Sequence, residues 1–143
     1  MICCAVAANG AFGLEGKLPW DIREELRHFR QTTLGKKVLV GKNTALPPLP
    51  GREVVIAERD TPLTPDMVLI GGKTLIESLQ EDPIWNVWKL SVIQEDYPAD
   101  VYFFPNLGDW EMIEERVEAG WCRKRQASVT IAYRTYQRRR STR

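Results

Sequence analysis

The chain has 143 residues, of which 43% are hydrophobic and 27% are charged, and its formal net charge is +1. This composition is typical of one folded domain with its own hydrophobic core, and it excludes extended disorder. The near-zero net charge gives no electrostatic reason to expect a nucleic acid or a membrane as partner, and no apolar run approaches the ~20 residues that a membrane-spanning helix needs.

Apolar runs separated by polar and glycine-containing segments predict the elements along the chain. The first run, 2–8, is continuously apolar, which is typical of a strand covered on both faces. The loop that follows, 10–19, holds three glycines and a proline, and long glycine-rich loops are often functional lids. The segment 110–120 has a helix-forming composition but a spacing that also suits a strand. We expect helices at 22–33 and 73–80, and buried strands at 37–41, 53–57, 67–72, 88–93 and 128–136.

Short buried strands that alternate with helices predict an α/β fold with a mostly parallel central sheet and helices on both faces. The last two strands lie close together in the chain without a crossover helix between them, so we expect an antiparallel edge at the C-terminus. In such sheets ligands bind at the carboxyl ends of the strands.

The cysteines and the histidine indicate neither a disulfide framework nor a metal site. Cys3 and Cys4 are neighbours in a strand-like run, so their side chains point to opposite faces, while Cys122 stands alone. His28 is the only histidine, and no metal-ligand spacing is present. The apolar start of the chain has no basic region before it and no small-residue cleavage site. We therefore expect no metal, no signal peptide and a reducing, cytoplasmic setting.

Two adjacent carboxylates open the first predicted helix. Asp21 is a good N-cap, and Glu24 three positions later completes the pattern of a capping box, worth on the order of 1 kcal/mol. Glu25 falls at the margin of the buried stripe, where partial burial would raise the pKa of its carboxyl. A solvated residue on the helix flank is the alternative that helix geometry alone leaves open. The expected stripe consists of Ile22, Leu26, Phe29 and Thr33.

The order of several motifs resembles the dihydrofolate reductase family. "AANGAFGLEGKLPW" is followed by an acidic residue five positions after the tryptophan, then by "GKNT", "LPGR" and "IGG", and the matches become sparser after Ile93. The resemblance implies a three-layer dihydrofolate reductase-like fold as a single domain over 1–143. It also implies NADPH-dependent reduction of 7,8-dihydrofolate to tetrahydrofolate by a cytoplasmic monomer that binds neither nucleic acid nor membrane.

The resemblance assigns catalytic roles to Glu25, Trp20 and Leu18. Glu25 would accept the two adjacent N–H groups of the pterin's amino-pyrimidine edge, a bidentate contact that is strong in an apolar pocket. Trp20 would help to fix the pterin or an ordered water, and Leu18 would belong to the loop that closes over the nicotinamide. Without the resemblance, Trp20 could equally be a core aromatic.

The resemblance also implies further contacts to substrate and cofactor. Arg52 in "LPGR" would pair with the carboxylate of the glutamate tail, although a loop arginine is otherwise more often solvated. The other substrate contacts would be Cys3, Ala5, Leu26, Phe29, Leu49 and Ser91, the last in place of the family's usual threonine. The cofactor contacts would be Ala5, Phe12, Leu18, Lys42, Asn43, Thr44, Arg59, Ile70, Gly71, Gly72, Lys73, Thr74 and Leu75.

Three of these cofactor features carry specific expectations. Residues 42–44 would open a short helix whose N–H groups attract phosphate. The family has a cis peptide at the position of Gly71 and Gly72. Lys42 and Arg59 stand where a 2′-phosphate could be gripped, which favours NADPH over NADH.

The sequence departs from the family pattern mainly between its second strand and "IGG". Only "ERDTPLTPD" separates Ala57 from Met67, where the family has another strand and a helix. Thr74 and Ile76 also replace a common arginine and the usual tyrosine. Residues 36–67 therefore form a reduced adenosine-binding subregion, and cofactor affinity could suffer.

Three alternatives compete with this interpretation. One is a related reductase of the same fold that acts on a pyrimidine or pteridine. Another is a non-catalytic relative that serves as a structural or binding module, which the trimmed adenosine region would favour. A third is nucleic-acid binding through the basic stretches "CRKRQ" and "YQRRRSTR", although such charges usually serve solubility or protect a strand edge.

Overall fold

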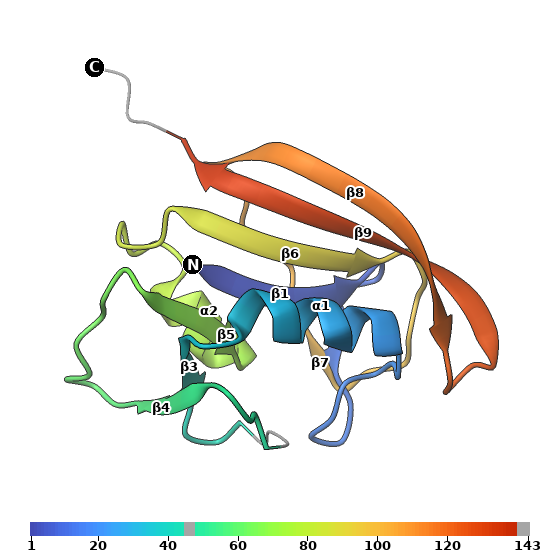
Figure 1. Ribbon diagram of the computed structural model, residues 1–143, viewed down its shortest axis with the longest axis horizontal. Coiled ribbons are helices and arrows are strands. Elements are labelled where there is room, and N and C mark those ends of the chain that lie inside the picture. Colours follow the sequence, from blue (N-terminus) through green and yellow to red (C-terminus); the bar gives the residue numbers. More distant parts are fainter. Residues whose placement is uncertain (45–47, 140–143) are drawn as a thin grey trace.

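A computed structural model describes residues 1–44 and 48–139 of the chain (Figure 1). Part of the proline-rich stretch, 45–47, and the last four residues of the basic C-terminus, 140–143, lie outside the described residues. The elements in chain order are β1 (Ile2–Ala7), β2 (Ala11–Gly13), α1 (Arg23–Thr33), β3 (Lys37–Gly41), β4 (Glu53–Ala57), β5 (Met67–Gly71), α2 (Lys73–Leu79), β6 (Val87–Ile93), β7 (Val101–Tyr102), β8 (Trp110–Cys122) and β9 (Ala127–Arg138).

One seven-stranded sheet organises the fold, in the strand order β4-β3-β5-β1-β6-β9-β8. The pairs from β4 to β6 are parallel, whereas β9 runs antiparallel to β6 and β8 runs antiparallel to β9. The prediction of a mostly parallel sheet with an antiparallel C-terminal edge is therefore confirmed. The long β8–β9 hairpin forms one border of the sheet and β4 the other (Figure 1).

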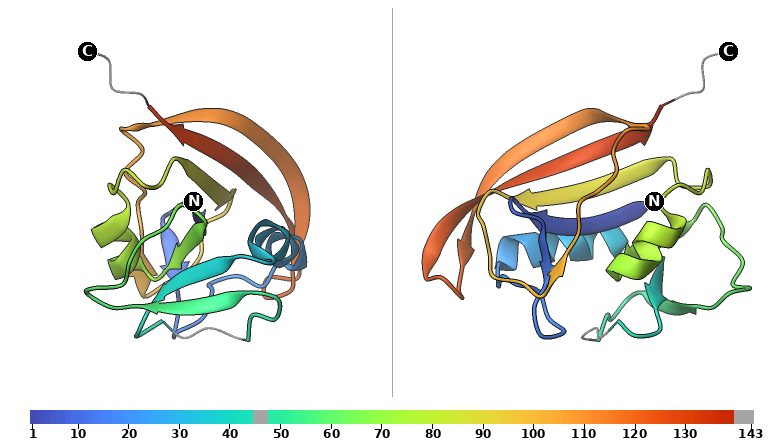
Figure 2. Two further views of the ribbon diagram at one scale, coloured as in Figure 1. Left: turned by 60° about the vertical axis from the view of Figure 1, so that its left-hand side comes forward. Right: turned by 180° about the vertical axis from the view of Figure 1, so that it is seen from behind.

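The two helices cover opposite faces of the sheet, as the left view of Figure 2 shows. Alternate residues of β1 serve the two faces, as expected for a strand buried on both sides. Ile2, Cys4 and Val6 belong to the core under α2, with the large side chains of Trp85 and Trp88. Cys3 and Ala7 face the opposite side, the side of α1.

The strand predictions hold with one correction in burial. The ambiguous segment 110–120 is strand, within β8. The segment 53–57 is β4, but it is not a buried strand, since Val54 is 45% exposed and Ile56 is 55% exposed. The reason is its place at the border of the sheet, where no further strand covers it. Between β4 and β5, residues 58–66 form neither strand nor helix, in agreement with the trimming predicted there.

The predicted start of the first helix needs a correction. Asp21 does not cap the helix: the N-cap residue is Ile22, which makes no side-chain capping bond, and α1 begins at Arg23. An isolated bridge between Ile22 and Cys122, together with a 2.8 Å hydrogen bond from Arg123 N–H to the Asp21 carbonyl, holds this segment extended against the end of β8. A contact from a distant strand therefore replaces the local cap.

The capping-box partner is also used differently. The Glu24 carboxylate accepts a 2.9 Å hydrogen bond from the backbone N–H of Trp121, in β8. The Asp21 carboxylate instead forms a 2.7 Å ion pair with Arg123. The two acids thus tie the start of α1 to β8 and to the turn that follows it, so Glu24 keeps a structural role, but with a different partner.

The buried face of α1 is rotated from the predicted stripe. Leu26 is 42% exposed, whereas Glu25 is only 5% exposed and Thr33 is fully buried. Phe29 is half-buried, against Cys3 and its neighbours. The apolar pattern placed Glu25 at the margin of the stripe, but packing of the helix against β1 and β8 turns it inward.

Two further findings concern the described residues as a group. None of the helices in 1–44 and 48–139 is long and apolar enough to cross a membrane. Residues 42–44 make a turn in which Thr44 N–H donates to the Gly41 carbonyl over 3.1 Å, and the residues 45–47, into which the expected short helix would continue, lie outside the described residues.

Candidate active site

Glu25 is a buried carboxylate on the face of the sheet that α1 covers. It lies in the first turn of α1, close enough for its charge to raise the pKa values of Cys3 in β1 and Tyr133 in β9. Ala5, Ser91 and Tyr133 stand side by side in register across β1, β6 and β9. Burial raises the pKa of the Glu25 carboxyl to about 7. Its proton is therefore exchangeable near neutral pH, which an ordinary surface glutamate does not offer.

Trp20 supplies an indole N–H beside this carboxylate. The side chain is only 3% exposed and packs edge-on against Tyr97, with ring centroids 5.9 Å apart. The indole lies close enough to Glu25 to oppose the rise in its pKa, yet Nε1 lacks a hydrogen bond of good geometry to any described residue. A buried donor of this kind is available to a water or a ligand that also touches Glu25.

An apolar wall extends from Glu25 along the same face of the sheet. Cys3 forms a buried cluster with Val38 and Val68, against which Phe29, Leu49 and Ile70 pack. Burial raises the pKa of the Cys3 thiol far above its usual range, with additional effects of Cys4 and Glu25, so this thiol is not a nucleophile at neutral pH. The structure thus brings together four residues that the sequence assigned separately, namely Cys3, Phe29, Leu49 and Ile70.

Arg52 lies at the other end of α1 from Glu25. Its Nη1 donates to Thr33 Oγ1 over 3.3 Å and its Nε donates to the Pro50 carbonyl over 3.2 Å. Thr33, fully buried, donates its hydroxyl to the Phe29 carbonyl over 2.8 Å. Thr33 follows Glu25 by eight positions in the helix, which corresponds to about 12 Å along the helix axis. A cation is therefore held at a fixed distance from the buried carboxylate.

A backbone cradle lies at the carboxyl ends of β3 and β5. Gly72 N–H donates to Thr44 Oγ1 over 2.9 Å, and the peptide between Gly71 and Gly72 is cis, as the resemblance implied. A Cβ at Gly72 would lie 3.1 Å from that hydroxyl, and a Cβ at Gly41 would lie 3.3 Å from it. These glycines therefore let β3, β5 and the start of α2 approach each other closely.

A cavity of about 600 Å³ lies beside this cradle. Three of the predicted cofactor residues, Lys42, Arg59 and Leu75, line it together. Its remaining lining residues are Ala57, Glu58, Thr61, Leu63, Ser78 and Leu79. The volume is within the usual range for small-molecule sites. The short connection after β4 and the outer side of α2 thus still enclose a pocket where the family's longer region is missing.

Comparisons with known proteins agree with these features. A family described as dihydrofolate reductase matches residues 1–68. A dihydrofolate reductase of Aedes albopictus is 25% identical over 175 residues, which cover 94% of each chain. The dihydrofolate reductase type 3 of Salmonella typhimurium is 39% identical over 62 residues, 41% of this chain and 38% of that one. A dihydrofolate reductase of Enterococcus faecalis, solved in complex with NADP(H) and RAB-propyl, superposes with a TM-score of 0.74 at 23% identity over 96% of both chains, which establishes the fold.

The first 68 residues thus match the dihydrofolate reductase family, and the whole chain shares the fold of a dihydrofolate reductase. The segment matched by the family description, 1–68, contains Trp20, Glu25 and Arg52 but ends before Gly71. Ser91 and Tyr133, which are neighbours across β6 and β9, come from the part of the chain after residue 68.

Two residues that the dihydrofolate reductase pattern assigned to the site lie apart from these groupings. Phe12 is half-buried in the core on the α2 side, with its ring 5.2 Å from that of Phe103. Leu18 is 40% exposed in the loop before Trp20. Three further predicted cofactor residues do not line the cavity but adjoin, in the sequence, residues of the cavity or the cradle: Asn43, Lys73 and Thr74.

Sequence reasoning missed Tyr133, which lies under the first turns of α1. It is 5% exposed, its ring centroid is 4.3 Å from that of His28, and Arg116 lies 4.9 Å from it. Burial raises the pKa of the Tyr133 hydroxyl to about 12, and the charge of Glu25 adds to the rise. More than a hundred positions separate the two residues in the chain, so only the alternation of β9 hinted that this side chain points inward.

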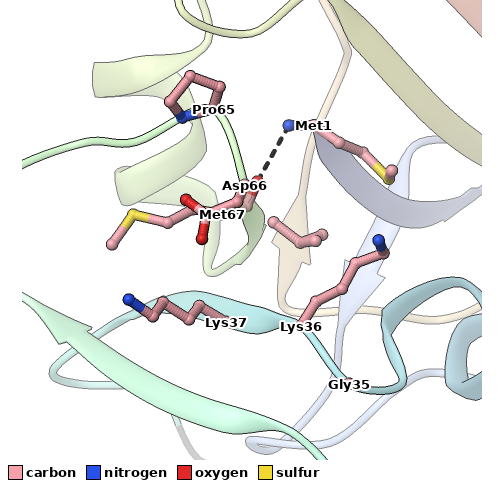
Figure 3. A pocket seen from close by; sticks show the side chains of 8 residues that line it. Met1, Gly35, Lys36, Lys37, Pro65, Asp66 and Met67 are labelled. Carbon is pink, nitrogen blue, oxygen red and sulfur yellow. Dashed lines mark hydrogen bonds between the residues drawn. The ribbon is translucent and has the colours of Figure 1, made fainter.

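A second, smaller cavity of about 320 Å³ lies away from the dihydrofolate reductase motifs (Figure 3). Met1, Lys37 and Met67, among its lining residues, stand at the amino ends of β1, β3 and β5, and the Met1 amine donates to the Met67 carbonyl over 3.1 Å. The cavity is therefore at the opposite edge of the sheet from the glycine cradle, and it takes no part in the candidate site.

Proposed function

We propose that this chain reduces 7,8-dihydrofolate to 5,6,7,8-tetrahydrofolate with NADPH as hydride donor. The observation that carries the proposal is the buried Glu25 carboxylate in the first turn of α1, beside an apolar wall, with Arg52 anchored to Thr33 at the other end of the same helix. A flat polar ring would occupy one end of such a site and an acidic tail the other. The relatives named dihydrofolate reductase support the same reaction.

Glu25 would anchor the pterin. Its two oxygens can accept the adjacent N–H groups of the amino-pyrimidine edge, and the low-dielectric surroundings strengthen this contact. The unpartnered Trp20 N–H would hold a water or a ring oxygen at the same place. The hydroxyl of Ser91, in the strand next to Ala5, supplies a further polar group on this face.

Glu25 would also support protonation of the pterin. Reduction needs a proton at the ring nitrogen as well as a hydride, and a carboxyl whose pKa is about 7 holds an exchangeable proton at neutral pH. We expect kcat/KM to fall as pH rises through about 7, because the protonated form becomes scarce.

Arg52 would bind the α-carboxylate of the glutamate tail. The guanidinium is half-buried and already oriented by Thr33 and Pro50, so less conformational freedom is lost on binding. Leu26, exposed on α1, would contribute to the wall between the two ends of the substrate.

The residues present fit a dinucleotide cofactor. When bound, NADPH supplies the hydride. The chain would hold it through the close approach that Gly41, Gly71 and Gly72 allow, and through the cavity lined by Lys42 and Arg59. Leu18, in the loop that precedes Trp20, would close over the nicotinamide end and exclude water.

The decisive experiment follows the loss of NADPH absorbance when purified protein is mixed with NADPH and dihydrofolate. We expect turnover, and we expect Glu25→Gln to lower kcat/KM at least about 100-fold and to remove its dependence on pH near 7. Glu24→Gln is the matched control, because it changes the neighbouring acid without touching the buried face. Folded protein without turnover would overturn the proposal and favour a non-catalytic relative.

A related reductase acting on a pyrimidine or a pteridine without a glutamate tail is the second candidate. The anchoring of Arg52 by the buried Thr33 favours a folate, since a tail-less substrate has no use for this cation. Arg52→Gln should weaken dihydrofolate binding but leave a tail-less pteridine unaffected. Equal losses for both ligands would remove Arg52 from the site.

We further propose that the protein acts as one domain over residues 1–143, as a monomer in the cytoplasm, without nucleic-acid or membrane partners. Three free buried thiols fit a reducing compartment. Two arginines of the basic stretch 122–126 are engaged inside the molecule, Arg123 with Asp21 over 2.7 Å and Arg125 with Glu95 over 3.4 Å. These pairs support a structural use of the basic residues.

A further inference from the structure

The cavity between α2 and the connection after β4 contains charges of both signs. Its apolar lining comes from Leu63, Leu75 and Leu79, which suits the flat face of a purine. Lys42, Arg59 and Glu58 line the same cavity and are all exposed. The sequence pointed to the two cations as a grip for phosphate, but it gave no role to the carboxylate between β4 and Arg59.

A tight turn fixes the backbone of Glu58. Its N–H donates to Thr61 Oγ1 over 2.7 Å, and Thr61 N–H donates to the Glu58 carbonyl over 3.1 Å. Thr61 also lines the cavity. This closed turn follows β4 directly, so the Cα of Glu58 is held at the cavity wall and its side chain starts from a fixed position.

The charges of the cavity do not neutralise one another by direct contact. Among residues 1–44 and 48–139, no ion pair within 4.0 Å joins Glu58 to Lys42 or to Arg59. A ligand in the cavity would therefore meet two separate cations and one separate carboxylate. A phosphate monoester is attracted by the cations and repelled by the carboxylate, whereas a pair of ribose hydroxyls can donate hydrogen bonds to the carboxylate.

We propose that Glu58 is a specificity-determining residue of the cofactor site. It accepts hydrogen bonds from the hydroxyls of the adenosine ribose and opposes the 2′-phosphate that Lys42 and Arg59 attract. As a result the chain discriminates weakly between phosphorylated and unphosphorylated nicotinamide cofactors, and it uses NADH as well as NADPH. The inference rests on the proposed function only in taking this cavity as the adenosine site.

Binding of two adenosine fragments tests the inference without catalysis. We would measure the dissociation constants of 2′,5′-ADP and 5′-AMP by isothermal titration calorimetry at low ionic strength. For the unmodified chain we expect a ratio below about tenfold. Glu58→Gln should tighten 2′,5′-ADP about fivefold or more and should not tighten 5′-AMP, whereas Arg59→Gln should weaken 2′,5′-ADP.

Glu77→Gln is the matched control, because it removes the same charge from the exposed side of α2 without changing a residue of the cavity lining. An equal gain in Glu77→Gln, an unchanged ratio in Glu58→Gln, or a preference of the unmodified chain for 2′,5′-ADP of about 100-fold would each overturn the inference. Lack of binding of both fragments would also overturn it, even if the chain reduces dihydrofolate. A shifted ratio without turnover would support it while the proposed function fails.

Discussion

At the scale of single residues, burial distinguishes the two adjacent acids of α1. Glu24 contacts the backbone of β8 from the rim of the helix, whereas Glu25 is 5% exposed and its carboxyl has a pKa of about 7. One position along a helix is a rotation of about 100°, which is enough to place neighbours in different dielectric surroundings. The chemistry proposed for Glu25 depends on this difference.

Glu25 should make the stability of the ligand-free protein depend on pH. Its carboxyl ionises near 4.5 when unfolded and near 7 when folded, so ionisation favours the unfolded chain as pH rises between these values. We expect Glu25→Gln to leave the free energy of unfolding similar at about pH 4 and to increase it on the order of 2 kcal/mol at about pH 8. Urea denaturation at both pH values measures this. A gain of the same size at both would mean that the carboxyl is not the cause.

At the scale of elements, the end of β8 sets the start of α1. Glu24, Asp21 and Ile22 each contact β8 or the turn that follows it, and Gly120 lies beside Ile22 and Glu24. A Cβ on Gly120 would lie 3.0 Å from side-chain atoms of both Ile22 and Ile131. The β8–β9 hairpin therefore positions the first turn of α1, which carries Glu25.

Gly120→Ala should disturb this junction. The added methyl group overpacks it, so we expect a loss of about 1–3 kcal/mol in the free energy of unfolding and a weaker affinity for dihydrofolate, because the first turn of α1 must shift. Gly108→Ala is the control, since a Cβ there would meet its nearest atom at an ordinary 3.5 Å. Denaturation and a folate titration measure the two effects. Unchanged folate affinity in a destabilised Gly120→Ala variant would separate the junction from the site.

At the scale of the whole molecule, trimming leaves β4 as an open border of the sheet. Val54 and Ile56 are exposed there, while Val55 and Ala57 on the other face pack against the core under α2. Exposed apolar border strands favour edge-to-edge association. We therefore expect this open border to promote association between copies of the protein.

Replacing Val54 and Ile56 should show whether the exposed border strand promotes association. We expect the double variant Val54→Thr and Ile56→Thr to change the free energy of unfolding by less than about 0.5 kcal/mol and to reduce aggregation on heating. Val55→Thr, on the packed face, should cost about 1 kcal/mol or more. Light scattering during a thermal ramp, together with urea denaturation, distinguishes the two faces. Equal destabilisation by both variants would contradict the assignment of β4 as an open border.

The sequence by itself indicated most element types, the mostly parallel sheet and the glycine motif at 71–72, and it placed Glu25 closer to the buried face than Glu24. These depend on local periodicity or on short motifs, which a single stretch of chain contains in full. Tertiary structure alone decided where α1 begins, how it is rotated, that Tyr133 lies beneath it and that Glu58 shares a cavity with Lys42. Each of these results from contacts between segments far apart in the chain, and burial of a side chain is settled only when its distant partner is in place.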